Sequence, residues 1–161
     1  MIKKVIAIKK LHLYLETTLF NYYFDEERDG HEDTVKLFEA ISSGEYAGYT
    51  SEYVMAELRG AKEPKKSNML FLAEKSPIAI LDTSEEIIRM ASLYIQNGVI
   101  PVKHWIDAAH IAVASVNELD CVLSFNYEHI NKLKTKRMTE NINLLEGYKG
   151  VTICTPMEVL S

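Results

Sequence analysis

Four polar residues of this chain stand where side-chain oxygen atoms could hold a metal ion. Glu16 directly follows an apolar run (LHLYL), and Asn126 directly follows another (VLSF). Glu57 and Asp107 lie in segments with the apolar periodicity of helices. Carboxylate and amide oxygens suit Mg²⁺ or Mn²⁺, and the sequence has no cysteine and histidine cluster with the spacing of a zinc finger. The residue types therefore indicate a hard divalent cation.

The two helical acids fall on faces that are otherwise largely apolar. Asp107 is followed at helical spacing by Ile111 and Ala114, and Glu57 shares its side of a helix with Leu58. A buried carboxylate without a partner is unstable enough that it takes up a proton, pairs with a cation or binds a metal. Each of these acids therefore needs a partner.

Each acid also has an ordinary structural explanation. Glu16 fits the start of a helix, where the helix dipole favours a negative charge. Glu57 fits an ion pair with Lys62 or a neighbouring arginine, and Asp107 fits a hydrogen bond with His110 or with a strand backbone. These explanations weaken when they are taken together, because all three acids are expected at one edge of one sheet.

The elements that would position these residues alternate along the chain. Short apolar runs predict five strands, at residues 11–15, 46–50, 78–81, 120–124 and 151–154. Helical periodicity is clearest in residues 31–41, 50–61, 84–98 and 103–118. This alternation predicts an α/β fold, a three-layer α/β/α sandwich with a central parallel sheet of about five strands. Ligands of such sheets bind beyond the carboxyl ends of the strands, where Glu16 and Asn126 fall.

Length and composition favour one soluble domain spanning residues 1–161. The chain is 47% hydrophobic and 25% charged, with no Pro/Gly-rich linker and no internal repeat. It has no apolar run long enough for a membrane span and no signal-peptide pattern at its start, so we expect a cytoplasmic protein. The two cysteines, Cys121 and Cys154, lie in short apolar runs and are expected to be free buried thiols.

The net charge of −5 is concentrated in one place. Residues 25–33 (DEERDGHED) hold six acids and one arginine, which sums to −5, so the rest of the chain is neutral. The simplest interpretation of this acidic run is a solvated turn. Basic clusters lie elsewhere, at Arg59, Lys62, Lys65 and Lys66 and at Lys132, Lys134, Lys136 and Arg137. An anionic partner is therefore compatible with the acidic pI.

Several acids that share one cation at a sheet edge are suited to phosphodiester hydrolysis. In that chemistry the metal activates the attacking water and neutralises charge on the phosphate. The sequence contains no G-x-x-x-x-G-K-[ST], no G-x-G-x-x-G and no G-x-S-x-G. Nucleotide-cradling loops and serine hydrolases are therefore not indicated.

Four blocks of the sequence resemble one known family. The blocks are YLETTLFNYYF, TSEYVMAELRGAK, DAAHIAVASVNELDCVLSFNYEHI and GYKGVTICTPMEVL. Together they resemble a PIN domain of the kind found in VapC-type toxins of prokaryotic toxin–antitoxin pairs. The resemblance covers about residues 11–160 and leaves residues 1–10 as an additional N-terminal segment.

The resemblance implies a metal-binding acidic pocket in which Glu16, Glu57 and Asp107 are the ligands. Asn126 stands where many members have a fourth acid, and Glu16 stands where they have Asp. A longer side chain at one position and a missing charge at the other predict weaker binding of Mg²⁺ (or Mn²⁺). Lys132, Lys134, Lys136 and Arg137 follow the last of these positions and are expected to contact RNA phosphates.

Two functions follow from the resemblance. The first is a metal-dependent endoribonuclease, a hydrolase that cleaves RNA and is the toxin of a toxin–antitoxin pair, with a small antitoxin partner and a homodimeric assembly. The alternative is a catalytically weakened PIN module that binds RNA or a protein without cleavage. His110 and His129 are candidate proton carriers, although a core partner for His110 and helix-end packing for His129 are the simpler interpretations.

Overall fold

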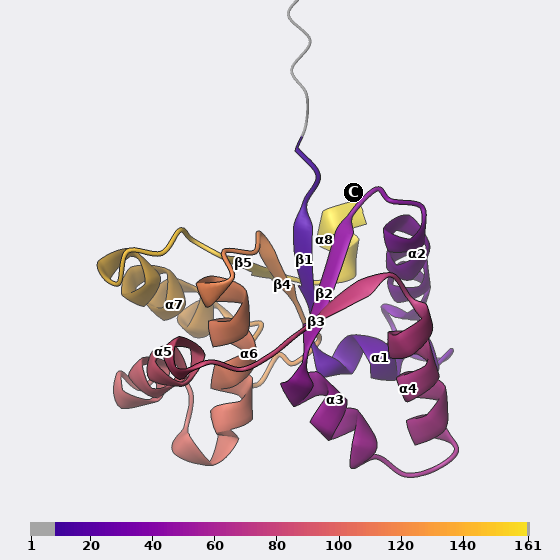
Figure 1. The fold of residues 1–161 in the computed structure, drawn as a ribbon, viewed down its shortest axis with the longest axis horizontal. Helices are drawn as coiled ribbons and strands as arrows, with labels where there is room; N and C mark the ends of the chain where they lie inside the picture. Colours follow the sequence, from indigo (N-terminus) through magenta and orange to yellow (C-terminus); the bar gives the residue numbers. More distant parts are fainter. Residues whose placement is uncertain (1–8, 161) are drawn as a thin grey trace, which may run out of the picture.

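A five-stranded parallel sheet forms the centre of the structure, a computed structural model in which residues 9–160 are described (Figure 1). The strands are β1 (His12–Leu15), β2 (Ala47–Ser51), β3 (Ile78–Leu81), β4 (Cys121–Leu123) and β5 (Thr152–Cys154). They are arranged in the order β3-β2-β1-β4-β5. Each lies within one residue of its predicted range, so the predicted parallel sheet is confirmed. Most of the predicted N-terminal segment 1–10 lies outside the described residues.

Helices cover both faces of this sheet. Figure 1 shows α1, α2, α3 and α4 on one side and α5, α6 and α7 on the other, so the predicted three layers are confirmed. The helices on the first side are α1 (Thr17–Tyr23), α2 (His31–Ser42), α3 (Glu52–Arg59) and α4 (Lys65–Lys75). The remaining helices are α5 (Glu85–Gln96), η1 (Val102–His104), α6 (Trp105–Val116), α7 (Leu133–Leu145) and α8 (Pro156–Leu160).

The carboxyl ends of the central strands are tied together by hydrogen bonds. Leu13, Tyr14 and Leu15 of β1 are fully buried. The N–H of Glu16, the next residue, donates to the carbonyl of Leu123 at the end of β4 (3.1 Å). The hydroxyl of Thr50 in β2 donates to the carbonyl of Leu15 (2.9 Å). The first residue after β1 is therefore fixed between the ends of its two neighbouring strands.

Two local features place the helices that carry the other predicted acids. The hydroxyl of Ser51 accepts the N–H of Val54 (3.4 Å) and caps α3. Helix α6 begins immediately after the 3₁₀ turn η1, and its residues 108–115 are all buried. Asp107 lies in the first turn of α6, at the end of the helix that is only partly covered.

Three further observations concern predictions made from composition. Cys121 and Cys154 are free and buried, as expected. Residues 25–30 form a turn before α2, and most side chains of the acidic run are exposed, in agreement with a solvated turn. Among the described residues, no helix is both long enough and apolar enough to cross a membrane.

Candidate active site

Glu16 is a buried acid whose carboxylate is engaged by two hydroxyls. Only 3% of the residue is exposed. Its Oε1 accepts hydrogen bonds from Thr18 (2.6 Å) and from Ser124 at the end of β4 (2.6 Å). Its side chain makes no capping hydrogen bond to helix α1, which begins at the next residue. Glu16 is therefore directed into the sheet edge, and its position is not explained by helix capping.

Glu57 is held by a chain of buried polar groups. Its Oε1 accepts from Thr17 Oγ1 (2.7 Å) and pairs with Nε2 of His110 (2.6 Å). The other ring nitrogen of His110 bonds the hydroxyl of Tyr14 (2.6 Å), which in turn bonds Ser51 Oγ (2.7 Å). Tyr14, Ser51 and His110 are all fully buried. The pairing of Glu57 with Lys62 is therefore not seen, and His110 is a core partner of Glu57.

Asp107 pairs with a histidine from a distant loop. Its Oδ2 lies 3.1 Å from Nδ1 of His129, in the segment between β4 and α7, and both side chains are largely covered. The expected hydrogen bond between Asp107 and His110 is replaced by this contact, because His110 is occupied by Glu57 and Tyr14. The ring of His129 therefore lies beside Asp107 in the candidate site, while its carbonyl accepts a hydrogen bond from Thr135 in α7.

Each of the three acids keeps one oxygen atom without a hydrogen bond or ion pair to any described residue: Glu16 Oε2, Glu57 Oε2 and Asp107 Oδ1. The charge of Glu57 also acts on both other acids and raises their pKa values. The acids are thus electrostatic neighbours. Within residues 9–160, however, they do not form a group whose ligand atoms all lie within 4.8 Å of one another.

The environment shifts the pKa values of these groups in different directions. Burial raises the pKa of Glu16, against the opposing effects of His110 and the two hydroxyls. Burial also raises the pKa of Asp107, opposed by His110 and His129. Burial alone would raise the pKa of Glu57, but the hydrogen bond and charge of His110 reverse this and lower it. Glu57 is therefore the acid most strongly held in its ionised form.

The charges of all three acids act on His110. Burial favours its neutral form, yet the hydrogen bond to Glu57 and the charges of Glu16, Glu57 and Asp107 raise its pKa. A protonated His110 offsets part of the repulsion among the three acids. Residue type and spacing predicted that His110 lies near Asp107. They did not predict the direction in which the ring of His110 points.

Asn126 lies at the predicted strand end, but its amide is used locally. The side-chain Oδ1 of Asn126 accepts a hydrogen bond from the backbone N–H of His129 (3.0 Å). The backbone N–H of Asn126 donates to Ser124 Oγ (3.0 Å). These bonds shape the turn that carries His129 toward Asp107. A role for Asn126 as a metal ligand stays a prediction.

The four predicted RNA-binding residues do not all line the same hollow. Lys132 and Lys134 line a hollow of about 530 Å³ that also includes His129 and Glu128. Lys136 lines a separate hollow over β5 with Glu140. Arg137 is exposed and lines neither of the two. Two of the four residues therefore lie beside a member of the candidate site.

Two residues of this site could not be predicted from the sequence. Ser124 reaches Glu16 because β4 pairs with β1, and His104 stacks on His129 with ring centroids 4.0 Å apart. A serine at a strand end and a histidine before a helix are common in any α/β protein. Their roles follow from strand order and loop path, which residue spacing does not encode.

Comparison with known proteins agrees with this architecture. The family model of the PIN domain matches residues 13–135. A comparison with curated protein sequences found no match.

Solved structures with a similar fold are toxins or toxin–antitoxin complexes. VapC20 of Mycobacterium tuberculosis, a sarcin-ricin-loop-cleaving toxin, has a TM-score of 0.55 at 11% identity, covering 87% of this chain and 98% of that one. VapBC2 of Rickettsia felis, bound to a promoter DNA fragment, has a TM-score of 0.54 at 17% identity, covering 75% and 94%. A toxin–antitoxin complex from Klebsiella pneumoniae has a TM-score of 0.55 at 16% identity, covering 75% and 92%. At these identities the likeness shows the fold.

Proposed function

Because the chain belongs to the PIN domain family, we propose that it is a divalent-metal-dependent endoribonuclease whose site is built on Glu16, Glu57 and Asp107. The observation that carries the proposal is the free oxygen on each of these acids at the carboxyl edge of the sheet. Glu16 directly follows β1, Glu57 lies in α3 and Asp107 lies in α6, and the three acids are electrostatic neighbours although they are far apart in the sequence.

The donor set suits the ion that the family implies. All three free atoms are carboxylate oxygens, which Mg²⁺ and Mn²⁺ prefer, and the other oxygen of each acid is already fixed by hydroxyls or imidazoles. Second partners of this kind orient metal ligands and increase their affinity. A bound divalent ion would neutralise phosphate charge and activate water for hydrolysis.

The protein's own residues have distinct parts in this proposal. Glu16 and Asp107 are the main ligands, and Glu57 assists as a further ligand or as an acceptor for the proton of the attacking water. Tyr14 and His110 are positioning residues, since they fix the carboxylate of Glu57 through hydrogen bonds of 2.6 Å. The pKa of Glu57 is lowered, so its carboxylate is ionised and able to accept a proton, which supports this role.

Substrate and partners follow from the similar structures. Two of those described are toxin–antitoxin complexes and another is a toxin that cleaves the sarcin-ricin loop. We therefore propose RNA as the substrate, a small antitoxin as a partner, a homodimeric assembly and a cytoplasmic location for this protein.

A metal titration with a mixed RNA pool tests the enzyme. We expect cleavage in the presence of Mg²⁺ or Mn²⁺. It should stop when EDTA is added and return when excess metal is supplied. Asp107→Asn is expected to reduce the cleavage rate by about a hundredfold or more, since it removes a ligand charge at the reacting phosphate. Cleavage that persists in EDTA, or in Asp107→Asn, would contradict the proposal.

One observation favours the alternative, a PIN module that binds RNA or a protein without cleavage. Glu16 is nearly fully buried and its pKa is raised by burial, so its availability as a charged ligand is reduced. The substitution Glu16→Asp separates the two functions. It should increase metal-dependent cleavage if a shorter carboxylate suits the ion better. RNA binding without cleavage, in both the parent and Glu16→Asp, would establish the binding module.

A further inference from the structure

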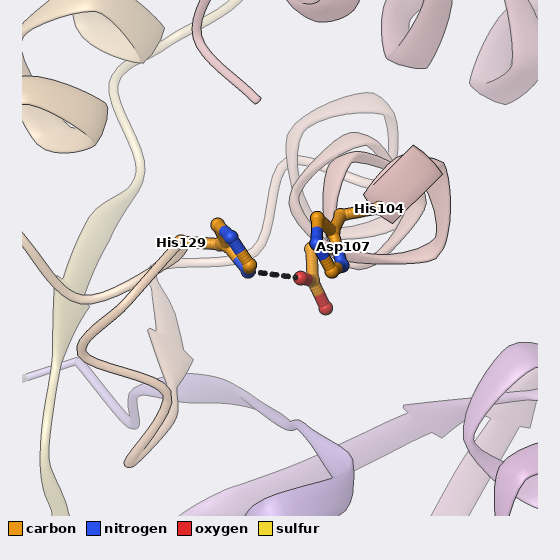
Figure 2. Close-up of side chains that lie close together, drawn as sticks. All are labelled: His104, Asp107 and His129. Atoms are coloured by element: carbon orange, nitrogen blue, oxygen red, sulfur yellow. Dashed lines mark ion pairs between the residues drawn. The ribbon is translucent and has the colours of Figure 1, made fainter. Parts of the chain in front are cut away.

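Two histidines and one acid form a compact group beside the proposed active site. His104, Asp107 and His129 each offer one ligand atom, and these atoms all lie within 4.8 Å of one another. Figure 2 shows the ring of His129 facing the carboxylate of Asp107, with His104 drawn next to Asp107. All three residues are partly buried, so the group is shielded from water yet reachable by an ion.

The backbone holds the three side chains in place before any ion binds. His104 and Asp107 are three residues apart at the start of α6, and the N–H of His104 donates to the carbonyl of Pro101 (2.9 Å). The N–H of His129 donates to Asn126 Oδ1 (3.0 Å), and its carbonyl accepts from Thr135 (2.7 Å). Neither histidine would need backbone movement to serve as a ligand.

The imidazole of His104 has no other evident task in the described part of the chain. It sits at the N-cap position of α6 but makes no capping hydrogen bond, and its ring contact is with His129 (centroids 4.0 Å apart). Imidazole nitrogens and a carboxylate oxygen are among the ligands that bind Zn²⁺ in proteins.

The distances agree with a transition metal of ordinary size. In a tetrahedral site with metal–ligand distances of about 2.0–2.1 Å, ligand atoms lie roughly 3.3 Å apart. His129 Nδ1 and Asp107 Oδ2 are already 3.1 Å apart. The opposite nitrogen of His129 lies 3.7 Å from Oε1 of the exposed Glu128, which is beyond hydrogen-bond distance.

We propose that His104, Asp107 and His129 bind a borderline divalent transition-metal ion of the Zn²⁺ class, in a site that adjoins the three-carboxylate pocket and has Asp107 in common with it. Imidazole nitrogen favours such ions over Mg²⁺, whereas the carboxylate pocket has the reverse preference. Three protein ligands leave a fourth position open, which is the arrangement of a reactive or exchangeable zinc site and not of a closed structural one.

The two sites share Asp107. Its Oδ2 faces His129, and its Oδ1 is free of hydrogen bonds to described residues. One carboxylate can therefore serve both ions. The proposal does not depend on RNA cleavage, since its test is metal binding, so its failure and that of the ribonuclease proposal are separate outcomes.

The chain carries a built-in probe for this site. Trp105 is the only tryptophan, and it directly follows His104. Titration of the untagged, metal-stripped protein with Co²⁺ is expected to quench its fluorescence at one ion per chain and to produce visible absorption bands of nitrogen-ligated cobalt. Zn²⁺ should displace Co²⁺ stoichiometrically, and millimolar Mg²⁺ should not.

Matched variants locate the ion. His104→Gln and His129→Gln are each expected to weaken Co²⁺ binding at least about tenfold. His12→Gln, at an exposed histidine of β1, and Glu16→Gln, in the neighbouring pocket, should leave it unchanged. Equal binding by the parent and both histidine variants would overturn the proposal.

Histidine side-chain NMR of the parent protein removes any dependence on variant folding. Addition of Zn²⁺ should shift the ring signals of His104 and His129 and leave those of His12 in place. Unchanged signals of His104 and His129 at saturating Zn²⁺ would equally reject the site.

Discussion

At the scale of single residues, the candidate site depends on which partner each charged group takes. His110 could pair with Asp107 by helical spacing, but its ring lies between Tyr14 and Glu57. Asp107 then takes His129. Strand ends and helix faces in the sequence led to the three candidate acids, and their role as ligands stays a prediction. The sequence did not predict which partner each acid takes, because that depends on the direction of a histidine ring in a packed interior.

The buried hydroxyl of Tyr14 provides the test of this pairing. Tyr14→Phe removes the partner of His110 Nδ1 and of Ser51, which should cost about 1–3 kcal/mol of folding free energy because buried polar atoms lose a hydrogen bond. It should also reduce metal-dependent RNA cleavage, because Glu57 loses its fixed orientation. Urea unfolding and cleavage rates measure the two effects.

Tyr94→Phe is the matched control. Tyr94 is also fully buried, and its hydroxyl bonds Ser115 (3.0 Å) and Asn143 (2.5 Å) away from the acids. We expect a similar loss of stability without a specific loss of cleavage at a temperature where both variants are folded. If the two variants lose cleavage equally, Tyr14 has no positioning role.

At the scale of elements, predictability follows from what each element buries. All five strands were predicted within one residue, because they are short continuous apolar runs between helices. Helix α7 gave no such signal, since its buried residues are polar: Thr135, Thr139 and Asn143. Helix α4 buries only Met69 and Ala73 and is equally weak in pattern. A helix that buries polar side chains shows no hydrophobic periodicity in its sequence, so it is hard to predict from that pattern.

An ion-pair network joins α5 to the end of α7 and makes a pH-dependent prediction. Arg89 contacts Glu86 (2.7 Å) and Glu146 (2.5 Å), and Tyr148 also donates to Glu86. The bonds from Arg89 and Tyr148 lower the pKa of Glu86 to about 2. Since the folded value is below the unfolded one, this stabilisation is present above about pH 4.5 and is lost as the pH falls toward 2.

Glu86→Gln should therefore lower the thermal midpoint at pH 6 to 7, with the difference from the parent narrowing as the pH falls from about 4.5 toward 2. Thermal unfolding followed by circular dichroism across this range measures it. Glu85→Gln, at the neighbouring exposed acid without a resolved ion pair among the described residues, is the control. A difference that stays constant with pH would contradict the assignment.

At the scale of the whole molecule, the parallel sheet brings together residues that are up to about a hundred positions apart. Glu16 directly follows β1, Glu57 lies in α3, the helix after β2, and Asp107 lies in the first turn of α6. Fold class predicted this edge as the site. The basic clusters were less predictable, since their placement depends on how α7 lies against the sheet.

The divided placement of the lysines leads to a prediction about RNA binding. Lys132 and Lys134 line the hollow that includes His129, whereas Lys136 lies over β5 beside Glu140. If RNA reaches the acids across the first hollow, Lys132→Glu and Lys134→Glu should each weaken RNA binding and reduce its dependence on salt by about one counterion. Lys136→Glu should have a much smaller effect. Fluorescence anisotropy with a labelled RNA at several salt concentrations distinguishes the three variants. Equal losses of RNA affinity in all three would mean that RNA follows the whole basic run instead of the hollow.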